Sequence, residues 1–231
     1  MSVAMHQRLS PPLLIFDLDG TLADTAGDLV NTLNVILARE GLANIGFAEA
    51  RAMVGGGARA LLERGFAVNG VQPSEARLDS LVRDFLAYYE AHIADETVLF
   101  PGVEQALDRF EQSGFAFAVC TNKVEHPAKL LLNKLGVASR FRAICGKDTF
   151  EVSKPDGGAL VGTIAKAGGD RHRAIMIGDS KTDIEAARHA RIPVIAVNFG
   201  YTREPVEVFR PDKVIGHFNE LWGAIEALGV C

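Results

Sequence analysis

Four short apolar runs limit this chain to a small number of folds. Each run is too short for a typical helix and is bounded by Gly, Asp or Asn. The runs are apolar on both faces, which is typical of strands in a parallel sheet that helices cover on each side. Segments with helical spacing lie between them. The pattern predicts an α/β fold with a Rossmann-like parallel core, whose strands are Leu13–Leu18, Phe115–Cys120, Ala174–Ile177 and Pro193–Val197.

A long stretch without a convincing strand interrupts this alternation between about Asp24 and Leu99. Its apolar residues recur at helical spacing, with a predicted helix stop at Gly41 and a predicted N-cap at Ser74. We therefore expect an α-helical cap domain at residues 24–95. It is inserted into a core domain that residues 10–23 and 96–231 form.

Three consecutive glycines, at positions 55 to 57, break the helical pattern inside this stretch. Glycine lets the backbone approach a ligand closely, although a flexible turn between two helices has the same composition. Gly56, at the centre of the turn, is therefore a candidate ligand contact.

Two carboxylates follow the first predicted strand. In the segment Asp17-Leu18-Asp19-Gly20-Thr21, residues 17 and 19 point the same way if the chain is extended, while Leu18 faces the core. In open α/β sheets, ligands bind in the crevice outside the carboxyl ends of the strands. The alternative is an Asp-Gly turn whose carboxylates are solvated.

A second pair of acids follows the strand that ends near Ile177. Asp179 stands at the strand terminus and Asp183 one helical turn further on, so both are within reach of the same crevice. Four converging carboxylates repel strongly unless a hard cation is present, and an all-oxygen site favours Mg²⁺. Asp183 is also suited to complement the dipole of a helix N-terminus.

A hydroxyl and a cation complete the predicted site. Thr121 and Asn122 close the second predicted strand, and Lys154, before Pro155, opens a helical segment. Lys154 is suited to neutralise phosphoryl oxygens, while Thr121 and backbone N–H groups hold them. A lysine before a proline is, taken alone, more often a solvated loop residue, so the combination carries the inference.

The ordered set of motifs resembles the haloacid dehalogenase superfamily of phosphatases. It consists of Asp17-Leu18-Asp19-Gly20-Thr21, then Thr121, then Lys154-Pro155, then Gly178-Asp179 with Asp183. The resemblance covers about residues 13 to 200, and the helical insertion is similar to that superfamily's mobile cap.

The resemblance implies a role for each matching residue. Asp17 is expected to be the nucleophile that forms an aspartyl-phosphate, and Asp19 the general acid and then the base. Mg²⁺ is expected at Asp17, the Asp19 carbonyl and Asp179, with Asp183 binding directly or through water. Thr121, Asn122 and Lys154 are expected to hold the phosphoryl group. One departure is the pair Gly157-Gly158, where members of the superfamily commonly carry a proline.

Within the superfamily, the glycine turn with Arg59 and the segment Thr121-Asn122-Lys123 are most similar to the subfamily that hydrolyses phosphoglycolate. This implies that Arg59 binds the substrate carboxylate, unless it is a solvated helix arginine. A sugar-phosphate phosphatase or a phosphomutase shares the same motifs. A dehalogenase does not need Asp19 or Mg²⁺, and a non-enzymatic binding module does not need the whole set.

Charge and composition exclude several classes of partner. The chain has 231 residues and a net charge of −5, without a basic run, which disfavours nucleic acid and anionic membranes. The first apolar run is too short for a signal peptide or a membrane span. Cys120, Cys145 and Cys231 lack metal-ligand spacing, so we expect reduced thiols and a cytoplasmic protein. The predicted partner is a small phosphorylated metabolite, and the chain is a monomer or a homodimer.

Overall fold

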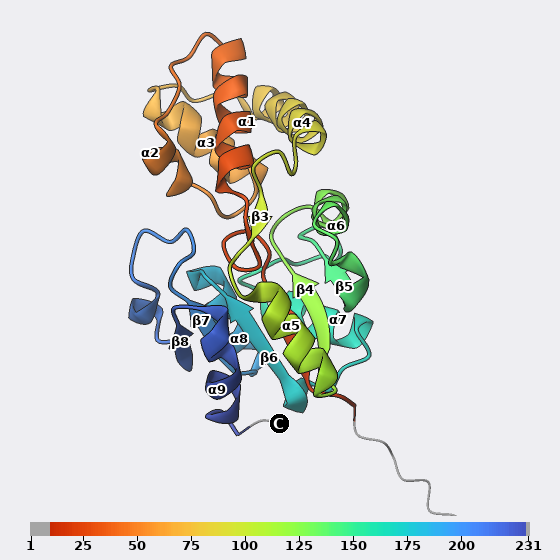
Figure 1. The fold of residues 1–231 in the computed structure, drawn as a ribbon. Coiled ribbons are helices and arrows are strands. Elements are labelled where there is room, and N and C mark those ends of the chain that lie inside the picture. Colours follow the sequence, from red (N-terminus) through yellow and green to blue (C-terminus); the bar gives the residue numbers. More distant parts are fainter. Residues whose placement is uncertain (1–9, 230–231) are drawn as a thin grey trace, which may run out of the picture.

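The core of the protein is a six-stranded parallel sheet, which the computed structural model describes within residues 10–229 (Figure 1). The strand order is β5-β4-β1-β6-β7-β8, and each neighbouring pair is parallel. This confirms the predicted α/β class. The strands are β1 (Leu13–Phe16), β4 (Ala116–Cys120), β5 (Phe141–Cys145), β6 (Ala174–Gly178), β7 (Val194–Val197) and β8 (Lys213–Ile215).

The sequence patterns missed β5 and β8. In β5 the buried residues alternate with the exposed Arg142 and the half-buried Ile144, so no continuous apolar run marks the strand. β8 has three residues. Both strands lie at the edges of the sheet, where one face or one side contacts solvent and the apolar signal weakens.

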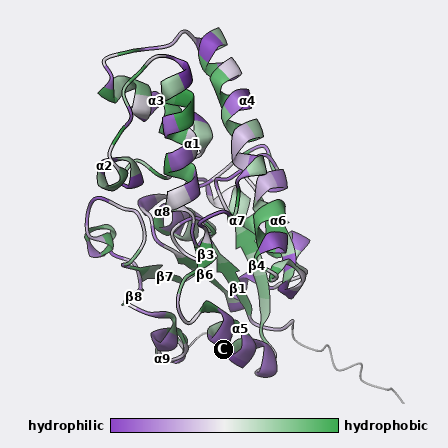
Figure 2. Ribbon diagram, turned by 45° about the horizontal axis from the view of Figure 1, so that its top comes forward, coloured by the Kyte–Doolittle hydropathy of each residue, from purple (hydrophilic) through white to green (hydrophobic). Residues whose placement is uncertain are grey.

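Helices cover both faces of the sheet, as predicted. Along β1, Leu14 and Phe16 belong to one apolar cluster, and Leu13 and Ile15 belong to another on the opposite face. The first cluster packs against α5 (Val103–Gln112), α6 (Glu125–Lys134) and α9 (Leu221–Glu226). The second packs against α7 (Gly157–Lys166) and α8 (Lys181–Ala190). Figure 2 shows hydrophobic residues concentrated in the central strands, while α5 is largely hydrophilic outside.

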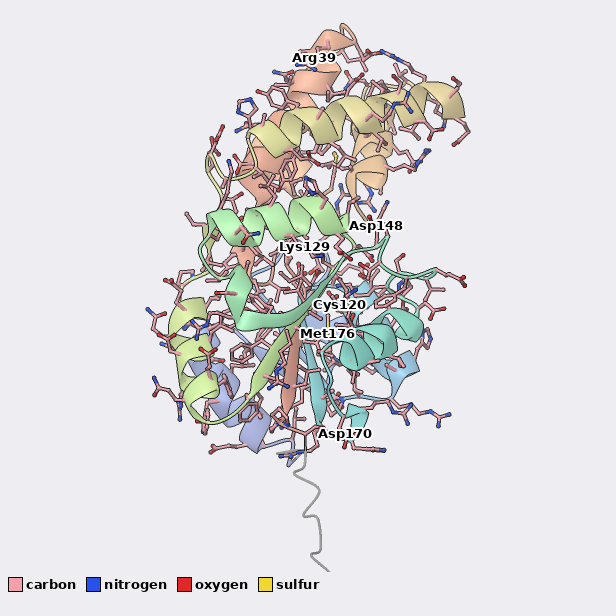
Figure 3. The ribbon with its side chains drawn as sticks, turned by 90° about the vertical axis from the view of Figure 1, so that its right-hand side faces the viewer. Arg39, Cys120, Lys129, Asp148, Asp170 and Met176 are labelled. Atoms are coloured by element: carbon pink, nitrogen blue, oxygen red, sulfur yellow. The ribbon has the colours of Figure 1, made fainter. Side chains whose placement is uncertain are left out.

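The interior also contains two of the three cysteines. Cys120 and Cys145 are buried, free and aligned on the neighbouring strands β4 and β5. Figure 3 shows Cys120 near Met176 in the middle of the sheet. Burial raises the pKa of Cys120 to about 11, which keeps the thiol protonated and supports its predicted role as inert core filler. Cys231 lies outside the described residues.

A helical bundle interrupts the core between β1 and β4. Its helices are α1 (Ala26–Arg39), α2 (Phe47–Arg51), α3 (Ala58–Val68) and α4 (Glu75–Ala91). Ser74 caps α4 as predicted, because its hydroxyl accepts a hydrogen bond from the Arg77 N–H at 3.4 Å. Figure 1 shows the bundle standing over the carboxyl edge of the sheet. The division into domains at residues 23/24 and 95/96 stays a prediction.

Two chain segments connect the bundle to the core. They pair as a short antiparallel ribbon, β2 (Ala23–Asp24) with β3 (Val98–Leu99). Asp28 on α1 is buried and holds the returning segment, because its carboxylate accepts hydrogen bonds from the N–H groups of Glu96 and Thr97, each at 3.0 Å. The Thr97 hydroxyl donates a further bond at 2.6 Å.

We expect Asp28→Ala to lower the free energy of unfolding by about 3 kcal/mol, because it leaves the buried hydroxyl and buried N–H of Thr97 without their acceptor. Urea denaturation at pH 7 measures this value. The control is Asp79→Ala, which removes a half-exposed carboxylate on α4 and is expected to change stability by less than about 1 kcal/mol. Equal effects of the two substitutions would contradict a structural role for Asp28.

None of the helices between residues 10 and 229 is both long enough and apolar enough to cross a lipid bilayer.

Candidate active site

Asp17 is the residue that follows the central strand β1. Its N–H donates to the Ile177 carbonyl at 2.9 Å, which fixes it between β4 and β6 at the carboxyl edge. The residue is 9% exposed, and its Oδ1 accepts a hydrogen bond from the Leu18 N–H at 2.7 Å. Gly20 then turns the chain at a φ of 83°, where a Cβ would lie 2.5 Å from Asp179 Oδ2. The loop therefore needs glycine at this position to bring the two aspartates together.

Three of the four predicted acids meet in three dimensions, while the carboxylate of Asp19 pairs with Lys123 instead. Carboxylate oxygens of Asp17, Asp179 and Asp183 lie within 4.8 Å of one another, and the last two side chains are buried. Asp183 also caps α8, since its Oδ2 accepts a hydrogen bond from the Ser180 N–H at 3.0 Å. Both interpretations of Asp183 from sequence therefore hold: it caps a helix and it belongs to the acidic cluster.

Lys154 is the buried cation of this cluster. Its ammonium group lies 3.1 Å from Asp17 Oδ1 and also pairs with Asp183, and the side chain is 1% exposed. The carbonyl of Lys154 accepts a hydrogen bond from Asn122 Nδ2 at 2.9 Å, so the loop is tied to the end of β4. The structure thus places Lys154 against the predicted nucleophile rather than in solvent.

The glycine pair after Pro155 does not loosen this loop. Asp156 caps α7 by accepting a hydrogen bond from the Gly158 N–H at 2.7 Å. A Cβ at Gly157 would lie 2.5 Å from the backbone nitrogen of Ala190, so only glycine allows α7 to pack this closely on α8. Glycine at position 157 is therefore a packing requirement of these two helices.

The remaining core residues of the predicted site lie around the same crevice. Thr121 is 3% exposed at the end of β4, and its hydroxyl accepts a hydrogen bond from the Lys123 N–H at 3.2 Å. Asp19 is less buried, and its Oδ1 accepts a hydrogen bond from Lys123 Nζ at 2.9 Å. Lys123 is therefore a second buried cation of the site, and the sequence did not predict a role for it.

A cavity of about 700 Å³ lies between the carboxyl edge of the sheet and the helical bundle. Asp17, Asp19 and Thr121 line it from the core, and Gly56 and Arg59 line it from the bundle. The guanidinium of Arg59, however, pairs with Glu75 at 3.1 Å and with Asp79, both on α4. In this structure Arg59 braces α3 against α4, and its role as a carboxylate contact stays a prediction.

Tyr201, which follows β7, was missed by the sequence analysis. Its N–H donates to Asp179 Oδ2 at 2.8 Å, and its hydroxyl accepts a hydrogen bond from the Thr25 N–H at 2.6 Å. The hydroxyl donates in turn to Asp24 Oδ1 at 2.7 Å. Tyr201 therefore connects the acidic cluster to the start of the helical bundle. No local signal marks it, because its partners are remote in sequence.

Burial and mutual repulsion shift the ionisation of the cluster. Burial, together with the neighbouring Asp183 and Asp17, raises the pKa of Asp179 to about 8. Burial raises the pKa of Asp17 to about 6, although Lys154 opposes the shift. Burial alone would lower the pKa of Lys154, but Asp17 and Asp183 hold it above its ordinary value. Lys154 therefore stays charged, and its single positive charge does not fully offset the repulsion between the clustered carboxylates.

This donor set fits a magnesium ion. The three clustered carboxylates are hard oxygen donors, and the raised pKa values of Asp17 and Asp179 indicate that a further positive charge would be stabilising here. Asp17, Asp179 and Asp183 would hold the ion, with the Asp19 carbonyl as the fourth predicted ligand. A bound Mg²⁺ would supply charge neutralisation for an anionic substrate.

We expect Mg²⁺ to raise the melting temperature more at pH 8.5 than at pH 5.5. The folded-state pKa values of Asp17 and Asp179 lie above the ordinary value of 3.8, so the metal-free fold binds more protons than the unfolded chain and loses stability as pH rises from about 4 to about 8. Mg²⁺ competes with those protons, so its stabilisation grows over the same range. Differential scanning fluorimetry with EDTA or MgCl₂ tests this. An equal shift at both pH values would contradict it.

The fold and site together define an α/β protein with a doubly covered parallel sheet and an aspartate cluster at its carboxyl edge. The profile of the haloacid dehalogenase-like hydrolase family matches residues 14–197. Curated relatives named phosphoglycolate phosphatase include those of Agrobacterium fabrum, 47% identical over 96% of this chain and 95% of the relative, and Caulobacter vibrioides, 46% identical over 92% and 90%. The chain therefore belongs to the haloacid dehalogenase-like hydrolase family, which confirms the resemblance seen in its motifs.

Solved structures agree with this assignment. A predicted phosphoglycolate phosphatase from Haemophilus somnus is 25% identical, covers 93% of this chain and 98% of its own, and superposes with a TM-score of 0.87. CbbY from Rhodobacter sphaeroides, solved with xylulose-(1,5)-bisphosphate, is 23% identical with a TM-score of 0.75, covering 91% of this chain and 96% of its own. The second likeness concerns the fold alone.

Proposed function

We propose that this protein is a magnesium-dependent phosphatase that hydrolyses 2-phosphoglycolate to glycolate and inorganic phosphate. The observation that carries the proposal is the contact of Lys154 with both Asp17 and Asp183, which places a buried cation against the predicted nucleophile. Near-full-length relatives at 46 to 47% identity bear the name of this activity. Two free thiols on neighbouring strands fit a cytoplasmic location.

The reaction proceeds through two displacements at phosphorus. A carboxylate oxygen of Asp17 attacks the phosphoryl group, forming an acyl phosphate, and the bond to the glycolate oxygen breaks. Asp19 gives its proton to that leaving oxygen. Asp19 then takes a proton from a water molecule, which attacks the acyl phosphate and restores the Asp17 carboxylate. The products are glycolate and inorganic phosphate, and both aspartates return to their starting states.

The other core residues bind and orient. Lys154 and Thr121 would hold the phosphoryl oxygens, and the Leu18 N–H fixes the orientation of the Asp17 carboxylate. Asn122 acts on the loop of Lys154 by donating to its carbonyl group. The helical bundle over the crevice would exclude bulk water while the acyl phosphate exists.

A sugar-phosphate phosphatase or a phosphomutase is the second candidate. The cavity of about 700 Å³ favours it, because this volume is within the range that encloses ligands much larger than phosphoglycolate. A mutase would return the phosphoryl group to another position of the sugar instead of to water.

A substrate screen separates these functions. Release of inorganic phosphate is measured with 2-phosphoglycolate, several sugar phosphates and an aryl phosphate, each with MgCl₂ or EDTA. We expect the highest kcat/KM with 2-phosphoglycolate and no turnover in EDTA. A clear preference for a sugar phosphate would reject the proposed substrate, and isomerisation without phosphate release would reject the phosphatase.

A further inference from the structure

Lys123 and Tyr89 meet where the core contacts the helical bundle. Lys123 comes two residues after Thr121, and its Nζ lies 2.9 Å from Asp19 Oδ1. The same Nζ lies 4.4 Å from the centre of the Tyr89 ring, which α4 contributes. Both residues are buried and both line the cavity that contains Asp17. Together they form a pair of polar side chains, one from the core and one from the bundle, on one side of the cavity.

Lys123 and Tyr89 have hydrogen-bonding capacity that the protein itself does not fully use. Tyr89 is 1% exposed, and its hydroxyl has no hydrogen-bond partner of ordinary geometry within residues 10–229, although the Lys123 ammonium lies beside it and interacts with it. Its ring stacks on Phe85 at a centroid distance of 6.1 Å, so the side chain is held in place by packing. The ammonium of Lys123 has three N–H donors, of which Asp19 engages one. A buried hydroxyl without a partner is rare in folded proteins and points to a missing ligand atom.

Most other cations around the cavity, Lys147 excepted, pair with other groups in this structure. Arg59 pairs with Glu75 and Asp79, and Arg64 donates to the Met53 and Gly55 carbonyls at 2.6 and 3.0 Å. Lys181 pairs with Glu185 at 3.6 Å, and Arg203 donates to the Ala52 carbonyl at 3.2 Å. Lys147 lies at the glycine turn, with its Nζ 3.6 Å from where a Cβ of Gly57 would be.

We propose that Lys123 and the Tyr89 hydroxyl bind the carboxylate of the substrate and make the enzyme selective for phosphate esters with an acid group beside the ester oxygen. The inference rests on the proposed function. Asp19 must lie within hydrogen-bond distance of the leaving oxygen to protonate it. In phosphoglycolate one methylene group separates that oxygen from the carboxylate, so a cation in contact with Asp19 is at the correct range. A charged donor and a neutral hydroxyl then satisfy a carboxylate that the cavity has removed from water.

The test compares two substrates that differ only in the acid group. They are 2-phosphoglycolate and ethyl phosphate, which has a methyl group in place of the carboxylate. The variants are Lys123→Met and Tyr89→Phe, and the control is Lys147→Met, which removes a lysine from the same cavity without touching Asp19. The ratio of kcat/KM for the two substrates is the readout, because any effect of Lys123 on Asp19 is common to both.

We expect Lys123→Met to lower this ratio about 10- to 100-fold and Tyr89→Phe to lower it about 5- to 20-fold, the range for losing a hydrogen bond to a charged group. Lys147→Met should change it less than about 2-fold. Equal losses on both substrates in the Lys123 and Tyr89 variants would overturn the proposal. So would a carboxylate-selective loss in Lys147→Met alone.

Binding without turnover provides a second measurement. In the Asp17→Asn background, calorimetry with MgCl₂ should show weaker binding of 2-phosphoglycolate after Tyr89→Phe, with unchanged binding of inorganic phosphate. Equal weakening of both ligands would mean a structural role for Tyr89 and would overturn the proposal.

Failure of the proposed function has a different signature. If the enzyme prefers another phosphate ester, 2-phosphoglycerate, whose carboxylate is on the carbon that bears the ester oxygen, and glycerol 2-phosphate replace the substrate pair. A preference for the acid that both variants lose would still support the Lys123–Tyr89 assignment. Absence of any preference for an acid group in the unaltered enzyme would overturn it.

Discussion

Replacing Asp17 with asparagine is expected to reduce hydrolysis of any phosphate ester by at least about 10⁴-fold, while the fold stays intact. A carboxamide is a poor nucleophile and cannot form the acyl phosphate. Its oxygen can still accept the hydrogen bond from the Leu18 N–H, so the loop keeps its anchor. Since burial raises the pKa of Asp17 to about 6, removing its charge should also make the metal-free protein more stable above that pH.

Phosphate release and thermal unfolding, measured on the same preparation, test both parts of this prediction. Asp95→Asn is the control, because it neutralises a side chain that is 59% exposed and lies outside the crevice. If Asp17→Asn were nearly as active as the unaltered protein, Asp17 could not be the nucleophile. We expect Asp95→Asn to release phosphate at the normal rate and Asp17→Asn to release none that can be measured.

Replacing Lys154 with methionine is expected to lower both activity and stability. Three buried carboxylates would lose their cation, and breaking a buried ion pair on one side costs about 3 to 5 kcal/mol. Loss of a cation that holds phosphoryl oxygens lowers kcat by about 10²- to 10³-fold. The stability loss should be largest at pH 8 and should shrink as pH falls through about 6, because Asp17 then takes up a proton.

Urea denaturation of the metal-free variant at pH 8 and pH 5.5, with kinetics in MgCl₂, measures these effects. Lys181→Met is the matched control, since this lysine is 59% exposed and pairs with Glu185 on the surface. We expect it to change stability by less than about 1 kcal/mol. A loss of stability in Lys154→Met that does not depend on pH would contradict the contact with Asp17.

The order of secondary structure was predictable because it depends on residues that are close in sequence. Central strands such as β1 and β6 are buried on both faces, so each appears as an unbroken apolar run. In the edge strand β5, buried residues alternate with residues that are exposed or half-buried, so the apolar pattern did not predict this strand. The N-cap at Ser74 was predictable because a cap bonds within its own first turn.

The candidate site divides in the same way. Asp17 and Asp179 were predictable because each directly follows a strand, and the carboxyl ends of parallel strands share one edge. Tyr201 and Tyr89 were not, because their importance comes from contacts with partners more than twenty residues away in the sequence. For Arg59, the sequence could not show that two acids on α4 engage its guanidinium.

The sequence by itself therefore determined the class of fold, the family and the set of aspartates, because local patterning and motif order carry that information. Only the tertiary structure decided which cations face the crevice, why α7 needs glycine at position 157, and how Tyr201 connects the cluster to the bundle. These features depend on the distances between atoms of separate elements. Those distances are set when the helices pack on the sheet, and no local pattern of residues encodes them.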